Sequence, residues 1–75
     1  MMLCDAGTGS VCRVMQIELP TKVRRRLEML GMTTGCAVTV MNTRKKGAVI
    51  IKVRGVRLAI GQKYAEKILI GSVNI

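Results

Sequence analysis

The sequence has almost no aromatic side chains. Tyr64 is the only aromatic residue among 75, and tryptophan and phenylalanine are absent. Barrels that bind single-stranded nucleic acid stack the bases on aromatic side chains, and grooves for proline-rich peptides are lined by aromatics as well. The composition therefore disfavours both kinds of recognition.

Groups for catalysis and metal binding are also scarce. The chain has no histidine and only four carboxylates, which are widely separated: Asp5, Glu18, Glu28 and Glu66. General acid–base and nucleophilic catalysis need a base beside an acid or a nucleophile, and ferrous iron prefers imidazole and carboxylate ligands. We therefore expect no enzymatic activity, no cofactor and no metal site.

Three cysteines, Cys4, Cys12 and Cys36, form neither an even set nor a C-x-x-C pair. We interpret them as reduced, small apolar side chains, with a labile thiolate site for a soft metal as the alternative. Apolar runs such as Ala48 to Ile51 are too short to cross a bilayer, and the N-terminus lacks a signal-peptide pattern. A cytoplasmic location is expected.

Positive charge and hydrophobic residues are both abundant. Thirteen Lys and Arg residues give a net charge of +9, while 49% of the chain is hydrophobic. A single domain covering 1–75 buries only about 60% of its unfolded surface, so some apolar side chains must stay outside. We expect a partner or a homo-oligomer. The charge favours an anionic partner: nucleic acid, an acidic protein face or an anionic membrane surface.

One stretch predicts an amphipathic helix. Val23, Leu27 and Leu30 fall on one line of a helical wheel and are expected in the core, while Lys22, Arg25, Glu28 and Met29 point away. Thr21 is a candidate N-cap. Gly31 follows as a left-handed C-terminal residue, and Met32 stands where the apolar contact of such a cap falls.

The remaining patterns predict five strands. Residues 11–17 need a bulge that switches faces, because Cys12 and Val14 would share one face and Met15 and Ile17 the other. The next strands cover 36–40, 49–53, 56–60 and 67–72, with a tight Arg54-Gly55 hairpin and a single helical turn near 61–66 between them. The inward residues are expected to be Val49, Ile51, Val53, Val56, Leu58, Ile60, Ile68 and Ile70.

This order of elements predicts a mainly β fold. Five short antiparallel strands, with one α-helix inserted between the first and second, form a small SH3-like barrel that the helix plugs. The segment 1–10 is expected to be an entry loop because of its Asp-Ala-Gly-Thr-Gly-Ser composition.

The chain resembles the FeoA family of bacterial ferrous iron uptake from about Gly9 to Ile70. The resemblance lies in Arg25-Arg26-Leu27-x-x-Leu30-Gly31-Met32-x-x-Gly35, in Gly55-x-x-Leu58-Ala59-Ile60 and in Ala65-x-x-Ile68-x-Ile70. It implies an SH3-like barrel that acts in the cytosol beside FeoB, a membrane transporter of ferrous iron. The family is often described as binding transition metals, but the residues here favour contact with FeoB over binding of iron by this chain.

The candidate partner-binding residues are a basic helix face and three apolar side chains expected outside: Lys22, Arg24, Arg25, Arg26, Met29, Ile50 and Leu69. The basic loop Arg44-Lys45-Lys46 is interpreted as a solvated hairpin tip. Two alternatives remain open, a nucleic-acid-binding barrel, which the charge permits and the aromatic content disfavours, and a weak transition-metal-binding or sensing domain. Peripheral contact with an anionic membrane surface is a further expectation.

Overall fold

A computed structural model describes residues 1–43 and 47–72. The predicted loop Arg44-Lys45-Lys46 lies outside the described residues. In chain order the elements are a short 3-10 helix η1 (Leu3–Asp5), β1 (Val11–Ile17), α1 (Thr21–Met29), β2 (Ala37–Thr43), β3 (Val49–Val53), β4 (Val56–Ile60), α2 (Gln62–Ala65) and β5 (Ile68–Ser72).

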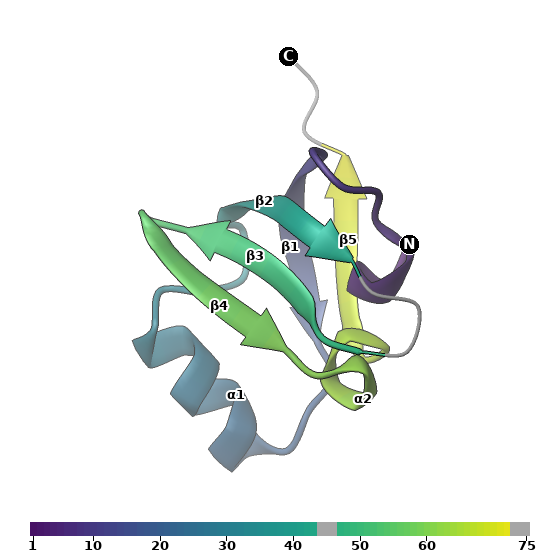
Figure 1. Ribbon diagram of the computed structural model, residues 1–75. Helices are drawn as coiled ribbons and strands as arrows, with labels where there is room; N and C mark the ends of the chain where they lie inside the picture. The colour runs from purple at the N-terminus through teal and green to yellow at the C-terminus, as the bar shows by residue number, and fades with distance from the viewer. Residues whose placement is uncertain (44–46, 73–75) are drawn as a thin grey trace.

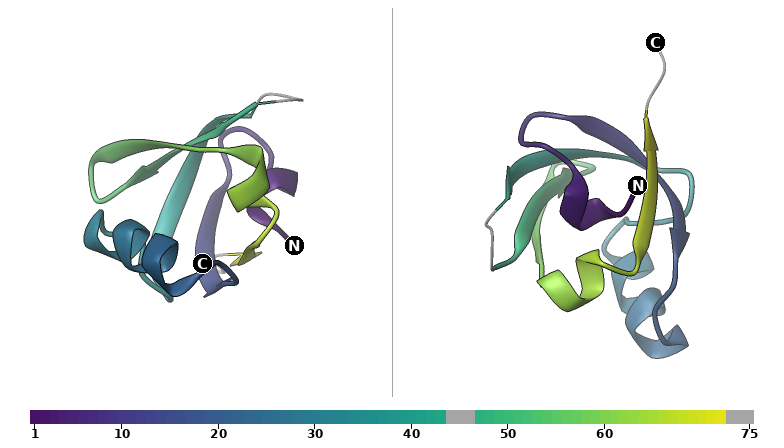
Figure 2. Two further views of the ribbon diagram at one scale, coloured as in Figure 1. Left: turned by 90° about the horizontal axis from the view of Figure 1, so that it is seen from below. Right: turned by 90° about the vertical axis from the view of Figure 1, so that its right-hand side faces the viewer.

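The five strands form one antiparallel sheet in the order β4-β3-β2-β1-β5. The sheet curls round on itself, and α1 lies at one end, beyond the strands (Figures 1 and 2). The predicted small SH3-like barrel, with its helix between the first and second strands, is confirmed. Curling lets short strands enclose a core that a flat sheet of this size would expose.

A bulge in β1 reconciles its ambiguous pattern, as the sequence predicts. The register against β5 shifts between Val14 and Gln16. Cys12, Val14 and Ile17 are buried, whereas Met15 is 51% exposed. The additional residue turns Ile17 back toward the core, which strict alternation would have prevented. A second register shift lies in β2, between Val40 and Asn42.

The end of α1 is a Schellman motif built from backbone hydrogen bonds. The Met32 amide donates to the Leu27 carbonyl at 3.0 Å, and the Gly31 amide donates to Glu28 at 3.0 Å. Gly31 has φ +103°, and Met32 is fully buried. The predicted stop is therefore confirmed. At the other end the prediction is wrong, because Pro20 occupies the N-cap and Thr21 is already helical.

Two residues predicted in the core lie outside it. Leu27 is buried and Val23 packs against the core, but Leu30 is 45% exposed because the helix ends there and its backbone (φ −84°, ψ 0°) no longer follows the wheel. Val56 is 46% exposed next to the Arg54-Gly55 turn. Of the other predicted inward residues, Leu58 is half-buried and the rest are buried.

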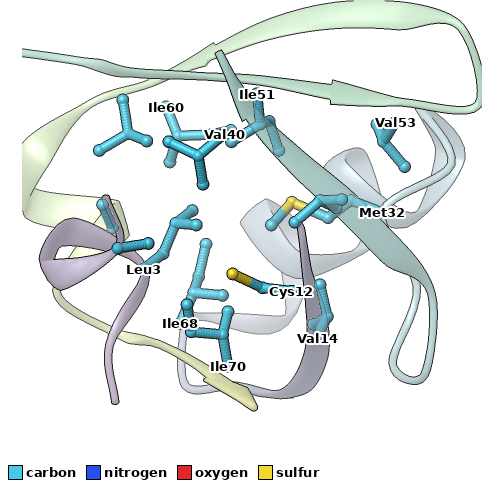
Figure 3. Close-up of a cluster of buried hydrophobic side chains, with 14 of the residues drawn as sticks. Leu3, Cys12, Val14, Met32, Val40, Ile51, Val53, Ile60, Ile68 and Ile70 are labelled. Atoms are coloured by element: carbon cyan, nitrogen blue, oxygen red, sulfur yellow. The ribbon is translucent and has the colours of Figure 1, made fainter. Parts of the chain in front are cut away.

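The N-terminal segment is more than the entry loop that its composition predicts. Leu3 in η1 is fully buried, and Figure 3 shows it pointing into the same cluster as Ile68 and Ile60. Ahead of η1, the Ile70 amide donates to the Met1 carbonyl at 2.8 Å, and Met2 forms a bridge with Leu69. The first residues therefore close the outer edge of β5 and fill part of the core.

Candidate partner-binding surface

The outer face of α1 carries a shallow groove of about 570 Å³. Its lining residues stand one helical turn apart, so that they form a continuous face turned away from Leu27. We call this set the α1 surface: Thr21, Lys22, Arg25, Arg26 and Met29.

Met29 is the most exposed large hydrophobic residue among the described residues, at 87%. Lys22 lies two turns before it on the same line, and Arg25 and Arg26 lie one turn before it on either side. The Met29 thioether therefore lies next to cations that occupy the two preceding turns of the helix. Within the described part of the chain, no ion pair joins these cations to a carboxylate.

The structure brings together only some of the residues predicted for the partner site. Lys22, Arg25, Arg26 and Met29 share the α1 surface, but Arg24 is exposed outside the groove lining. Ile50 on β3 and Leu69 on β5 are each half-buried on other elements, and neither lines the groove. The seven predicted residues thus divide into one cluster on α1 and separate positions elsewhere.

A second exposed apolar area, which the predicted site residues do not include, lies on β1. Val11 and Met15 are 49% and 51% exposed. A Cβ atom at Gly71 would lie 3.4 Å from Cγ and Sδ of Met15, so the Met15 side chain lies directly over the neighbouring strand β5. The sequence signal for this arrangement is the bulge at Met15 together with a glycine on the paired strand.

The cysteines do not form a metal centre in the described residues. All three are free, and the described residues contain no group of three or more His, Cys, Asp or Glu side chains that could hold a metal ion. Cys12 is buried and lines a cavity of about 160 Å³ beside Ser10, Val11 and Ile70. Burial raises the pKa of the Cys4 thiol, and the carboxylates of Asp5 and Glu66 raise it further. The raised pKa lowers the fraction of Cys4 thiolate, the form that binds metals.

Among the helices of the described residues, none combines the length and apolar character that crossing a lipid bilayer requires.

Solved structures similar to this chain include FeoA proteins. One, described as an iron uptake regulatory protein (FeoA), is 31% identical, with a TM-score of 0.85 and coverage of 93% of each chain. The FeoA protein from Chlorobium tepidum is 25% identical, with a TM-score of 0.90, covering 99% of this chain and 71% of that one. A manganese-dependent transcriptional repressor shares the fold, at 17% identity and a TM-score of 0.86, over 97% of this chain and 41% of that one.

Comparison with curated protein sequences gives no match. The FeoA domain family matches residues 1–71, nearly the whole chain. The similar solved structure that is 31% identical, with 93% of each chain covered, gives the same family as this match. The chain belongs to the FeoA family.

Proposed function

We propose that this protein is a non-enzymatic accessory protein of bacterial ferrous iron uptake. In this proposal it works in the cytoplasm and binds the cytosolic side of a FeoB-like transporter. The family supports the link to iron uptake, and one similar solved structure is described as an iron uptake regulatory protein. The observation that carries the proposal for partner binding is the α1 surface, on which three cations precede an exposed methionine on one helix face.

The chemistry of that surface suits binding more than catalysis. No histidine, cysteine or carboxylate is among the described residues that line the groove, so the usual general acid–base pairs are missing there. An interface needs an apolar centre with a polar rim, and Met29 with its neighbouring cations offers both on a small scale. The barrel contributes a rigid support for this helix through Leu27 and Met32.

The experiment measures binding of the purified protein to full-length FeoB in detergent and, separately, to its isolated cytosolic part. We expect saturable binding that weakens as salt rises, because exposed charges are screened. Arg25→Glu should weaken it by about tenfold or more, in the range of an interface anchor. Failure of the wild-type protein to bind either form of FeoB would contradict the proposal.

Ile50→Asp tests whether the interface reaches β3. Ile50 is half-buried on that strand and lies outside the α1 surface. Because it is separate from the groove, we expect this variant to bind FeoB as the wild-type protein does, provided that its thermal unfolding is unchanged. Duplex DNA serves as the control partner. Submicromolar, salt-sensitive binding to DNA with no binding to FeoB would favour the nucleic-acid alternative instead.

A further inference from the structure

We infer that the α1 surface is a docking groove for an acidic protein segment that places one apolar side chain on Met29 and carboxylates on Arg25 and Arg26, one turn before it. The identity of the partner as FeoB rests on the proposed function. The chemistry of the segment does not, because it is set by the groove itself.

The arrangement of side chains sets the pattern that the segment must match. Lys22 and Met29 lie along one line of α1, while Arg25 and Arg26 flank that line on opposite sides. The segment must therefore present an apolar group at the Met29 end of the surface and negative charge along the preceding turns, on both sides of that line. Methionine is a suitable anchor because its unbranched, polarisable side chain adapts to the shape of the apolar group that meets it.

Charge complementarity argues for carboxylates as the flanking groups. Arg25 and Arg26 have no ion pair among the described residues, and Glu28, on the same helix, is half-buried outside the groove lining. An arginine guanidinium matches a carboxylate with two parallel hydrogen bonds. An acidic segment would supply the partners that these cations lack within the described chain.

The groove fits a protein segment better than a lipid surface or a nucleic acid. A helix that lies on a membrane needs a broad apolar face, whereas Met29 is the only apolar side chain among the described residues that line this groove of a nine-residue helix. Nucleic-acid grooves without sequence preference add aromatic stacking, and none of the described lining residues is aromatic.

The test uses the full chain and a synthetic peptide that carries a central leucine flanked by glutamates, with a second peptide in which the leucine is replaced by serine. Arg25→Glu removes a flanking cation, and Met29→Ser removes the anchor while leaving the charge unchanged. Lys63→Glu on α2 makes the same charge reversal at an exposed position outside the groove. Each variant is checked first by thermal unfolding.

We expect Arg25→Glu to weaken binding of the leucine peptide by about tenfold and Met29→Ser by several-fold, with Lys63→Glu within about twofold of wild type. The serine peptide should bind more weakly than the leucine peptide. Equal losses from Arg25→Glu and Lys63→Glu would show attraction by net charge alone and would overturn the inference. The inference would also be overturned if the protein bound phosphatidylglycerol vesicles or duplex DNA but not the peptide, and if Arg25→Glu abolished that binding.

The same variants separate this inference from the proposed function. If FeoB binds the wild-type protein and both α1 variants equally well, the groove is not the docking site, although the partnership stands. If FeoB does not bind at all but the peptide binds with the expected dependence on Arg25 and Met29, the partnership is wrong and the docking groove stands.

Discussion

Gly31, at the end of α1, lies against the side chain of Arg54, in the turn between β3 and β4. A Cβ atom built on Gly31 would lie 3.3 Å from Cδ of Arg54. The helix end and the hairpin are thus in contact across the barrel. The backbone hydrogen bonds at Gly31 and Met32 end the helix, and Arg54 limits the space beside that end.

Replacing Gly31 with alanine should destabilise the fold. Gly31 has φ +103°, a conformation that L-residues rarely adopt, and the new methyl group would push against Arg54. We expect a loss of about 1–2 kcal/mol in the free energy of unfolding. A domain of this size should then melt about 4–16 °C lower.

Gly7→Ala is the matched control for Gly31→Ala. A Cβ atom there would meet nothing within 4 Å, and Gly7 is not among the residues with positive φ. Its melting temperature should stay close to that of the wild type. Equal destabilisation by the two substitutions would show that the helix stop is not what Gly31 contributes.

Leu3→Ala and Leu30→Ala make the same chemical change at two depths. Leu3 is fully buried, whereas Leu30 is 45% exposed. Leu3→Ala should cost about 2–5 kcal/mol because it leaves a cavity in the core, and Leu30→Ala should cost much less. Urea titration followed by circular dichroism measures both. A larger loss from Leu30→Ala would restore the sequence-based prediction that Leu30 belongs to the core.

Cys4 should react slowly with iodoacetamide, and faster as pH rises. Burial and the carboxylates of Asp5 and Glu66 raise its pKa, so that less of the reactive thiolate is present at any pH below that value. Glu66→Gln removes one negative charge and should lower the pKa, which speeds the modification at a fixed pH. Peptide mapping by mass spectrometry reports the rate at Cys4 alone.

The same raised pKa determines the sign of the linked stability. Because folding favours the protonated Cys4 thiol, the stabilisation is fully present below the thiol pKa of the unfolded chain and is lost as pH rises through the thiol pKa of the folded chain.

Unchanged alkylation of Cys4 in Glu66→Gln would show that this carboxylate has no influence on the thiol.

Ferrous iron should give no saturable isotherm with the purified protein under anaerobic conditions. The described residues contain no group of three or more His, Cys, Asp or Glu side chains, and the net charge of +9 repels a dication. Isothermal titration calorimetry measures this directly. A stoichiometric isotherm that disappears when Cys4, Cys12 and Cys36 are changed to serine would support the metal-sensing alternative.

Features of the fold that depend on near neighbours in the chain could be predicted from the sequence. Gly31 and Met32 form the helix stop that their order indicates, and Val49, Ile51 and Val53 alternate inward as a strand with one buried face requires. The burial of Leu3 could not be predicted in this way. It depends on packing against β5 and α2, which are far away in the sequence, and the surrounding glycines favoured a loop.

Only the part of the candidate site that lies on α1 could be predicted from the sequence. A helical wheel places Lys22, Arg25 and Met29 on one outer face, and the structure confirms that they share a groove. Strand alternation indicates which way Ile50 and Leu69 face but not where β3 and β5 lie relative to α1. That relation depends on the curl of the sheet, and neither residue lines the groove on α1.

The two register shifts in β1 and β2 have a consequence for how this chain tolerates change. Each shift adds one residue that reverses inside and outside for the later residues of its strand. Part of the bend in each strand is therefore set by the number of residues that the strand places between its pairing positions. Deleting Met15 would remove the bulge from β1: Gln16 would still lie opposite Leu69 and Ile17 opposite Ile68, so Ile17 would stay inward while the strand lost the extra twist that the bulge adds.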